Sequence, residues 1–464
     1  MLKLRKITTS NGFDALDLDN GRQNNYAWSM EELGEHIYVG TGRNIILQGI
    51  MTMPNLKAPL DLSPNILDNT GEIWRYRKDN SYMWERVLKT DPSDNIRGFR
   101  FMIKYDSFGI KPALYAAGMG ETIKIYKSTN GVNWFPLSND INDPLIGTSS
   151  RAMVVHNGKL YIATGYDSDP STAYIYSSTD PELEGWTLET PQFPSPNMIQ
   201  GSVQLLESFN EHLYASTISD EGICLWRTIG SEPSQGGWKL VLDKGGGDAS
   251  NNFPGSIGIY RNHLYLGSAV FSFSTKGMLS PKGAELFRID INDNWELIVG
   301  NISPENPTTP TTGQRNFPIS GCESGFNNKF NFYMWQVKAY ADQLLVGTFD
   351  NSSMVEPYLE LLLKNRDLLI SSGMSLDAFN SVVDSLKEQI FYLKMNKNKI
   401  GFDLYRSIDG ESFTPITLNG LGNPYNYGSR ILFTSDNGKL YIGTANPFQG
   451  CEVWETPSFH NEYM

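Results

Sequence analysis

The sequence predicts an all-β protein built from a repeated unit. In each copy an apolar residue, usually Tyr, precedes one or two small residues and then, in most copies, Thr or Ser. The chain also contains 43 Gly and 12% aromatic residues, a composition typical of many short strands separated by turns. The seven copies span residues 38–41, 115–118, 161–164, 214–217, 265–268, 345–348 and 441–444. Because repeats of this length stack into one object, we expect residues 1–464 to form one domain.

Each copy belongs to a unit of four expected strands. In the third unit, residues 150–156 and 159–164 flank Asn157-Gly158, which is a strong hairpin signal. Two further short strands follow, and the fourth strand of most units begins at an aromatic residue. Residues 128–134 and 407–413 resemble the Asp-box turns of sialidase-like proteins, in which a polar side chain binds its own turn. These turns are structural, so they indicate a fold and not glycoside cleavage.

The seventh unit stops after its third strand. The N-terminal residues 2–7 alternate apolar and basic, as a strand with one buried face does. This segment supplies the missing fourth strand, and closing a ring in this way removes the exposed edge of an open array. The sequence therefore predicts a seven-bladed β-propeller that is closed by its N-terminal strand.

Long insertions follow the second strand of three units, at residues 43–71, 271–283 and 351–401. In a propeller these loops open on one face, which we therefore expect to be the functional face. In residues 351–401, apolar side chains recur at helical spacing from Leu376 to Leu393, and a second Leu-rich helix is expected over 357–370. We expect a helical hairpin that forms a lid over the channel. The alternatives are a peripheral decoration or an interface with a protein partner or a second copy.

Composition excludes several classes of function. The net charge of −13 leaves no basic patch for nucleic acid. The three Cys are isolated, and His36, His212 and His263 share one turn position, so neither a disulfide framework nor a metal centre is expected. No apolar run is long enough to span a bilayer. We expect a cytoplasmic protein with no membrane partner and no cofactor.

Asp350 is the candidate catalytic residue. It lies two residues after Thr348, beneath the expected lid, where burial raises the pKa of a carboxyl group and suits it to general-base catalysis. The alternative is an Asp that caps a turn. Arg100, Arg151 and Arg430 stand at or near the start of first strands, where they are placed to hold an anion in fork geometry. The alternative for each is a structural ion pair. Asp350, Thr348 and Arg430 form the expected catalytic set, with Arg100 and Arg151 binding substrate.

Aromatic residues indicate a pocket for an apolar or aromatic small molecule. Tyr333 and Trp335 lead into the first strand of the sixth unit, and Tyr425 and Tyr427 lie in the connection to the seventh. With Asn446, they are expected to bind substrate, since such linings are usual for small-molecule sites. Packing between blades would require similar residues, so that alternative remains open.

Four segments carry a resemblance to a known family. They are residues 72–77, 346–350, 422–428 and 443–448. The chain resembles a bacterial family of single-chain seven-bladed propellers and, more distantly, the propeller of the cylindrocyclophane-forming (Friedel–Crafts) alkylating enzymes of cyanobacteria. Those enzymes join a resorcinol ring to a secondary alkyl chloride, with an Asp as base and a Thr two residues before it. The resemblance implies that Asp350 deprotonates a phenol-like nucleophile.

One departure limits what the resemblance implies. Those enzymes also carry a calcium-binding domain with Gly-Gly-x-Gly-x-Asp repeats, which this chain lacks. Chloride activation and a calcium requirement therefore do not carry over. The leading hypothesis is a small-molecule enzyme of the alkyl-transferase type that forms a C–C or C–O bond, as in secondary metabolism. The rival is a non-catalytic propeller that binds a glycan or a protein. A weaker alternative is a sialidase-like or lyase-type carbohydrate enzyme, which needs a three-arginine cluster and an acid pair around the channel.

Overall fold

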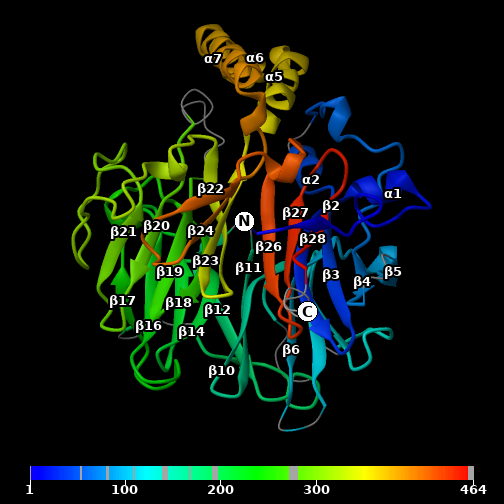
Figure 1. Ribbon diagram of the computed structural model, residues 1–464, viewed down its shortest axis with the longest axis vertical. Coiled ribbons are helices and arrows are strands. Elements are labelled where there is room, and N and C mark those ends of the chain that lie inside the picture. Colours follow the sequence, from blue (N-terminus) through cyan, green and yellow to red (C-terminus); the bar gives the residue numbers. More distant parts are fainter. Residues whose placement is uncertain are drawn as a thin grey trace, which may run out of the picture.

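The architecture is mainly β (Figure 1), and the ladders between the described strands are antiparallel. The computed structural model describes residues 2–52, 55–79, 83–107, 109, 111–137, 145–166, 169–190, 197–270 and 281–457. Most of the expected insertion at 271–283 lies outside these residues. The described strands pair in seven successive groups of four, which we call units one to seven.

The first four units are contributed by residues 24–242. Unit one contains β2 (Asn24–Leu33), β3 (His36–Arg43), β4 (Glu72–Arg77) and β5 (Trp84–Lys89). Unit two contains β6 (Gly98–Tyr105), β7 (Ala113–Met119), β8 (Lys124–Ser128) and β9 (Phe135–Pro136). Unit three contains β10 (Ser149–His156), β11 (Lys159–Tyr166), β12 (Asp169–Ser178) and β13 (Thr187–Leu188). Unit four contains β14 (Val203–Phe209), β15 (His212–Thr217), β16 (Cys224–Thr228) and β17 (Trp238–Leu242).

The last three units complete a ring. Unit five contains β18 (Phe253–Tyr260), β19 (His263–Ala269), β20 (Leu286–Ile289) and β21 (Trp295–Val299). Unit six contains β22 (Asn331–Tyr340), β23 (Gln343–Asp350), β24 (Leu404–Ser407) and β25 (Thr414–Thr417). Unit seven contains β26 (Gly428–Thr434), β27 (Leu440–Ala445), β28 (Val453–Glu455) and β1 (Arg5–Lys6). The first strand of each unit contacts the first strand of the next, and β26 contacts β2.

The N-terminal strand pairs with the last strand of the chain. Arg5 lies opposite Glu455 in the ladder and forms an ion pair with it. The ladder of β1 is shorter than the strand expected over residues 2–7, but backbone pairing continues, since the Ile7 N–H donates to the Val453 carbonyl at 2.9 Å. The fourth strand of unit seven therefore comes from the opposite end of the sequence.

The repeated Tyr of the second strands is core in every unit that has it. Tyr38, Tyr115, Tyr161, Tyr214, Tyr265 and Tyr441 are each at most 1% exposed. Tyr38 and Tyr265 reach the turns that resemble Asp boxes in the following unit. A Cβ at Gly131 would lie 1.8 Å from the Tyr38 hydroxyl, and one at Gly410 2.0 Å from that of Tyr265. Both glycines also have positive φ, so only glycine fits there.

Three helices lie between β23 and β24 and project from one end of the molecule (Figure 1). They are α5 (Val355–Lys364), α6 (Arg366–Ser371) and α7 (Leu376–Met395). The single helix expected over 357–370 is therefore wrong, because the chain breaks at Asn365, which has φ −112° and ψ 17°. The Lys57 N–H donates to Asn365 Oδ1 at 2.7 Å, and Asn365 Nδ2 donates to the Lys57 carbonyl at 3.0 Å. The break thus joins the insertion of unit one to that of unit six.

The other helices are short. They are α1 (Leu18–Gln23), α2 (Ile45–Met51), α3 (Lys244–Gly247) and the 3₁₀ segments η1 (Leu60–Leu62), η2 (Pro92–Asp94), η3 (Ser324–Phe326), η4 (Ser352–Met354), η5 (Lys397–Lys399) and η6 (Gly420–Gly422). Within the described part of the chain, no helix is both long and apolar enough to cross a membrane.

Four units share a buried polar arrangement, which we call the anchor. In each, an Asn at or just before the first strand donates Nδ2 both to a carboxylate at or just before the third strand and to a glycine carbonyl. The Asn–carboxylate pairs are Asn24–Glu72 (2.9 Å), Asn251–Glu285 (2.7 Å), Asn331–Asp403 (2.6 Å) and Asn426–Glu452 (2.7 Å). All eight side chains are buried. The anchor therefore fixes the first strand to the third while satisfying a buried carboxylate.

Removing an anchor Asn tests this role. Asn251→Ala removes the donor to Glu285 Oε2 and the 2.9 Å hydrogen bond to the Gly245 carbonyl, and we expect a loss of about 2–4 kcal/mol in the free energy of unfolding. Urea unfolding measures the loss. The exposed Asn133, replaced by Ala in the same way, serves as control and is expected to change stability by less than about 0.5 kcal/mol. Equal stability of both variants would contradict the role of the anchor.

Candidate functional site

Charge compensation separates unit six from the other anchored units. Glu72 is paired with Arg43 at 3.4 Å and Arg86 at 3.0 Å, Glu285 with Arg315 at 2.6 Å, and Glu452 with Lys6 at 2.9 Å. Among the described residues, no Lys, Arg or His lies within ion-pair distance of Asp403, the corresponding carboxylate of unit six. This anchor alone therefore keeps an uncompensated acid.

Asp350 takes the place that a cation holds in unit one. It is the last residue of β23, two positions after Thr348, as Arg43 is two positions after Thr41. In the strand ladders Asn331 lies opposite Asp350, and Asn24 lies opposite Arg43. Unit six thus has a second carboxylate where unit one has a guanidinium group.

The two carboxylates of unit six share one amide. Asn328 Nδ2 donates to Asp350 Oδ2 at 2.8 Å and to Asp403 Oδ2 at 3.4 Å. The Ser352 N–H donates to Asp350 Oδ1 at 2.8 Å, so Asp350 also caps the turn into η4, as the alternative interpretation expected. Asp350 is fully buried, and Asp403 Oδ1 has no hydrogen-bond partner among the described residues. We call Asp350 and Asp403 the acid pair.

Both carboxyl groups of the acid pair have raised pKa values, mainly because they are buried. Burial, with the charge of Asp403 adding to it, raises the pKa of Asp350 to about 7. Burial also raises the pKa of Asp403 to about 6, although hydrogen bonds from Asn331 and Asn328 favour its charged form. The acid pair therefore titrates near neutral pH, as two close carboxylates without an ion-paired cation do.

Thr348 positions the acid pair. Its hydroxyl donates to Asn331 Oδ1 at 2.8 Å and accepts from the Asp403 N–H at 2.9 Å. These bonds hold the Asn that binds Asp403 and also hold the backbone of Asp403. Thr348 thus belongs to the same cluster as Asp350, and its hydroxyl has partners within that cluster.

An aromatic cluster packs around Phe349, next to the acid pair in the chain. Phe349 stacks on Trp335, with ring centroids 5.1 Å apart, and meets Tyr427 edge-on at 4.2 Å. The hydroxyls of Tyr427 and Tyr26 are hydrogen-bonded. The Asp350 N–H donates to the Tyr427 carbonyl at 2.8 Å, which links the cluster to the acid pair through the backbone. Successive side chains of a strand point to opposite faces, so Phe349 and Asp350 face different neighbours.

Helix α5 reaches this cluster. Burial raises the pKa of Tyr26 and of Tyr427, and the nearby Tyr358 of α5 raises both further. Helix α5 packs with α7 and Phe330 in one apolar core, and Tyr358 packs against that core. Tyr358 therefore belongs to the helical core and lies near the two tyrosines of the aromatic cluster.

Every unit has a β-bulge in its first strand. In units one to six it follows the residue opposite the end of the repeated pattern, and in unit seven it follows Gly428, which lies opposite Ala445, one residue past that end. The bulged residues are Trp28, Arg100, Arg151, Gln204 and Gly255 in units one to five, and the bulges of units six and seven span residues 335–336 and 429–430. A bulge re-aims a side chain away from the regular alternation of a strand. We call these seven positions the bulge ring.

The bulge ring brings together the three arginines that the sequence singled out. Arg100 lies over the Trp28 ring at 5.7 Å, and Arg430 over Trp335 at 5.0 Å. Burial, together with the positive charge of Arg100, lowers the pKa of Arg151 and of Arg430 to about 9. Burial raises the pKa of Tyr333, and all three arginines lower it, so its hydroxyl is near each of them.

Two expected substrate-binding residues have contacts elsewhere. Tyr425 is 42% exposed and packs on Phe448 at 5.0 Å. Asn446 is buried, donates to Asn426 Oδ1 at 3.1 Å and caps the turn that follows β27. Both sets of contacts lie around the anchor of unit seven.

Sequence reasoning missed Asp403, Asn328 and Tyr26. Asp403 had a signal, because Glu72, Glu285 and Glu452 occupy the corresponding position before or at the third strand of other units. The sequence gives no such signal for Asn328 or Tyr26. Asn328 lies in a loop, and Tyr26 is brought to Tyr427 only by closure of the ring.

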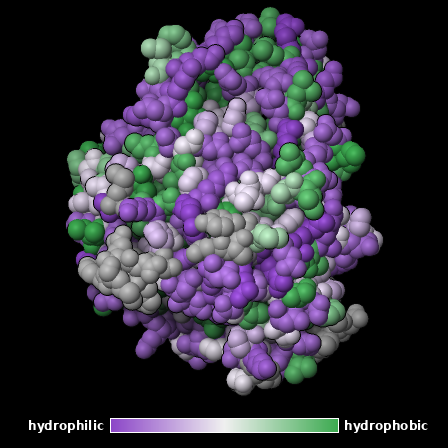
Figure 2. Space-filling model, turned by 45° about the vertical axis from the view of Figure 1, so that its right-hand side comes forward, coloured by the Kyte–Doolittle hydropathy of each residue, from purple (hydrophilic) through white to green (hydrophobic). Residues whose placement is uncertain are grey.

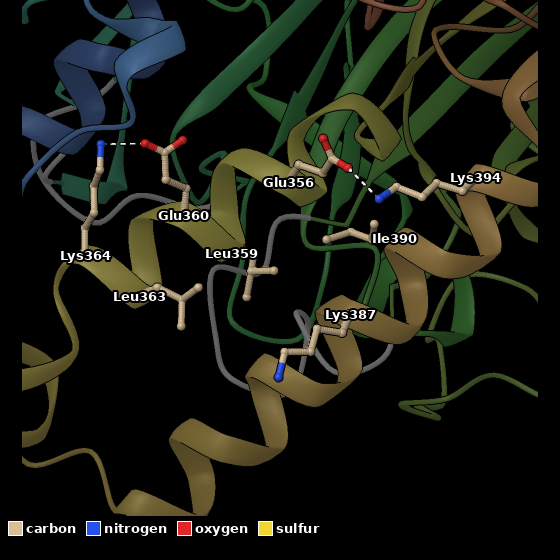
Figure 3. Close-up of a pocket in the computed structure, with 8 residues that line it drawn as sticks. All are labelled: Glu356, Leu359, Glu360, Leu363, Lys364, Lys387, Ile390 and Lys394. Atoms are coloured by element: carbon tan, nitrogen blue, oxygen red, sulfur yellow. Dashed lines mark ion pairs between the residues drawn. The ribbon is translucent and has the colours of Figure 1, made fainter.

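A groove between α5 and α7 lies on the helical projection (Figure 3). It has a volume of about 510 Å³ and is lined by Glu356, Leu359, Glu360, Leu363, Lys364, Lys387, Ile390 and Lys394. Ion pairs Glu360–Lys364 and Glu356–Lys394 flank its apolar floor. The space-filling view shows hydrophobic residues among hydrophilic ones on this projection (Figure 2). In the described ranges, no group of three or more His, Cys, Asp or Glu side chains is arranged for a metal ion.

Comparisons with known proteins leave the function open. No protein-family model matches the chain, and no curated protein matches it. Among solved structures, it is similar to a lectin from Burkholderia pseudomallei, with 8% identity over 94% of this chain and 99% of that chain and a TM-score of 0.49. It is also similar to a Trypanosoma rangeli sialidase in complex with sialic acid (9% identity, 74% and 57% covered, TM-score 0.37) and to a protein of unknown function from Bacteroides thetaiotaomicron (11%, 75% and 73%, 0.38). Because the TM-scores are below 0.5, these similarities do not assign a function to the chain. None of the three proteins is named as an alkylating enzyme.

The acid pair predicts an unusual dependence of stability on pH. Asp350 has a pKa of about 7 in the folded protein and about 3.9 when unfolded, so unfolding between these values releases a proton. Its contribution to stability is present below pH 4 and is lost as the pH rises through 7. The other groups facing the pair are Asn328, Tyr405 and Lys399, whose charge favours ionised Asp403.

Asp350→Asn is therefore expected to be more stable than wild type at pH 8, by about 2–4 kcal/mol, and similar to it at pH 4. Urea unfolding at both pH values measures the difference. Asp409→Asn in the same unit is the control, because hydrogen bonds from the Ser412 and Glu411 N–H groups lower the pKa of Asp409, so its loss destabilises at neutral pH. If wild type is instead more stable than Asp350→Asn at pH 8, the negative charge of Asp350 is compensated in the folded protein, which contradicts this prediction.

Proposed function

We propose that the chain is a seven-bladed β-propeller enzyme that acts on a phenol- or resorcinol-like small molecule, with Asp350 as the proton acceptor. In this proposal β1 closes the ring, and residues 351–401 and 43–71 form a lid on one face. The observation that carries the proposal is the acid pair, a buried pair of carboxylates without a cation at the foot of the helical insertion.

The acid pair supports the role of base. A general base works best when its pKa lies near the working pH, and the pKa of Asp350 is raised to about 7. Asp403 supplies the like charge that adds to the effect of burial, while Thr348 and Asn331 hold it in place. Among the anchored units, only unit six combines a second acid with the absence of a paired cation in the described residues.

The aromatic cluster supports a phenolic substrate. Phe349, Trp335 and Tyr427 offer ring faces and edges to which an aromatic ring can pack, and such contacts are favourable beyond simple burial. Tyr358 of α5 lies near Tyr427 of the cluster, and the bond between Lys57 and Asn365 ties the two insertions together. A lid of this kind excludes water, which strengthens electrostatic interactions inside the pocket.

The resemblance to alkylating enzymes gives the reaction. Asp350 accepts the proton of a phenolic O–H, and the electron-rich ring carbon or oxygen forms a bond with the carbon of an alkyl electrophile. The bond from that carbon to its leaving group breaks, and the leaving group departs with the electron pair as an anion. Where the ring carbon reacts, its C–H bond then breaks and the oxygen regains a proton, which restores the aromatic phenol. Proton, bond and charge are thereby balanced without a redox cofactor.

Two alternatives from the sequence remain proposals. The groove between α5 and α7 supports a non-catalytic propeller that binds a partner through the insertion. The meeting of Arg100, Arg151 and Arg430 near Tyr333 supplies one of the two requirements of a sialidase-like or lyase-type carbohydrate enzyme. The other requirement is an acid pair around the channel. Asp403 is part of the anchor of unit six, and the hydrogen bonds of Asp350 and Asp403 are to Asn328, Asn331, Tyr405 and Ser352.

The decisive variant is Asp350→Asn. The assay combines alkylresorcinols and simple phenols with alkyl halides or sulfonates and detects the alkylated product by mass spectrometry. We expect Asp350→Asn to lower the rate at least about 100-fold, because removal of a general base costs about that factor. Asp409→Asn, in an exposed turn of the same unit, is expected to keep full activity. Full activity of Asp350→Asn contradicts the proposal. A wild-type protein that neither alkylates nor is thermally stabilised by any phenol supports the binding alternatives instead.

A further inference from the structure

We infer that the bulge ring is an anion site, at which Arg100, Arg151 and Arg430 bind the carboxylate, sulfate or phosphate group of a small molecule. The inference goes beyond the proposed function, since an anion can bind the ring whether or not Asp350 accepts a proton. It also gives the chemical class of the ligand, which must carry an oxyanion.

The ring positions point these side chains at one another. The seven first strands contact one another in cyclic order, from β2 through β26 and back to β2. Arg100 and Arg151 are the extra residues of their strands, and Arg430 lies within the bulge of β26. In units one to six the bulge follows the residue opposite the end of the repeated pattern, and in unit seven it follows the residue opposite the next position, Ala445, so the seven bulges lie at similar levels of the ring. The influence of all three arginines on Tyr333 is consistent with this convergence.

Two of the arginines lack a counterion. Neither Arg100 nor Arg430 has a carboxylate within ion-pair distance in the described part of the chain, and the Nε of each is buried without a hydrogen-bond partner. Arg430 is only 5% exposed. By contrast, the buried Arg43 and Arg315 bind Glu72 and Glu285 directly. A buried guanidinium without a counterion is costly to fold, so its place in the ring is explained if a ligand supplies the negative charge.

The surroundings favour an oxyanion on an aromatic or apolar molecule. A guanidinium group presents paired N–H donors that match two oxygens of a carboxylate, sulfate or phosphate. Trp28 and Trp335 lie against Arg100 and Arg430, which leaves planar apolar surface beside the charges. Tyr333 adds a hydroxyl near all three arginines. A bare halide would use only part of these donors.

The test uses the intact protein and inorganic phosphate, sulfate and acetate at constant ionic strength set with sodium chloride. Calorimetric titration and thermal unfolding measure binding, and we expect wild type to be stabilised by at least one oxyanion in a saturable way. Arg430→Met and Arg100→Met are each expected to weaken binding of that anion at least tenfold. Both variants are also expected to have a higher midpoint of unfolding than wild type in anion-free buffer, because each removes an uncompensated charge.

The matched control is Arg315→Met, which removes a buried arginine that has a carboxylate partner. It is expected to lower the midpoint of unfolding and to leave anion affinity unchanged. The inference is overturned if no oxyanion stabilises wild type, or if Arg430→Met and Arg100→Met keep wild-type affinity. It is also overturned if both variants are destabilised as much as Arg315→Met in anion-free buffer. Loss of activity in Asp350→Asn has no bearing on these outcomes, so the two proposals fail separately.

Discussion

The structure depends on how it compensates buried carboxylates. Four units tie their first strand to their third through an Asn and an acid that are both removed from water, and an isolated buried charge is too costly to keep. Units one, five and seven meet this constraint with Arg43, Arg315 and Lys6. Unit six does not, because Asp350 stands where Arg43 stands in unit one. A repeated structural element thereby becomes a site at which a proton, and not a cation, balances charge.

The end of the second strand organises both candidate sites. In unit six, Thr348 holds the anchor and Asp350 follows two residues later. Across the ladder, the residue opposite Thr348 is Met334, and the bulge begins immediately after it at Trp335. The same relation places Arg100 and Arg151 next to residues opposite Gly118 and Thr164. The end of the second strand therefore holds Asp350 of the acid pair and, across the ladder, the bulge of the first strand, and Phe349 packs on Trp335 of that bulge.

The sequence was sufficient for features that repeat and insufficient for features that depend on one pairing. Tyr38 and its equivalents, the four-strand order and the pairing of the N-terminal segment follow from periodicity and turn residues. Asp350 was found because the copy at residues 345–348 is the only one with an acidic residue two positions after its end. Asp403 was missed because its importance comes from the absence of a cation, which only three-dimensional neighbours reveal. The bulges were hidden because an extra residue does not disturb the composition of a strand, and the break at Asn365 arises from its contact with Lys57, far away in the chain.

The central claim is that Asp403 and burial hold the pKa of Asp350 near neutrality. The most direct measurement is the pH titration of the Asp350 side-chain carboxyl by ¹³C NMR, with its signal assigned from the spectrum of Asp350→Asn. We predict a midpoint near 7 in wild type and a clearly lower midpoint in Asp403→Asn, where the like charge is gone. A midpoint near 4 in wild type that Asp403→Asn does not change would show that Asp350 is an ordinary turn-capping carboxylate.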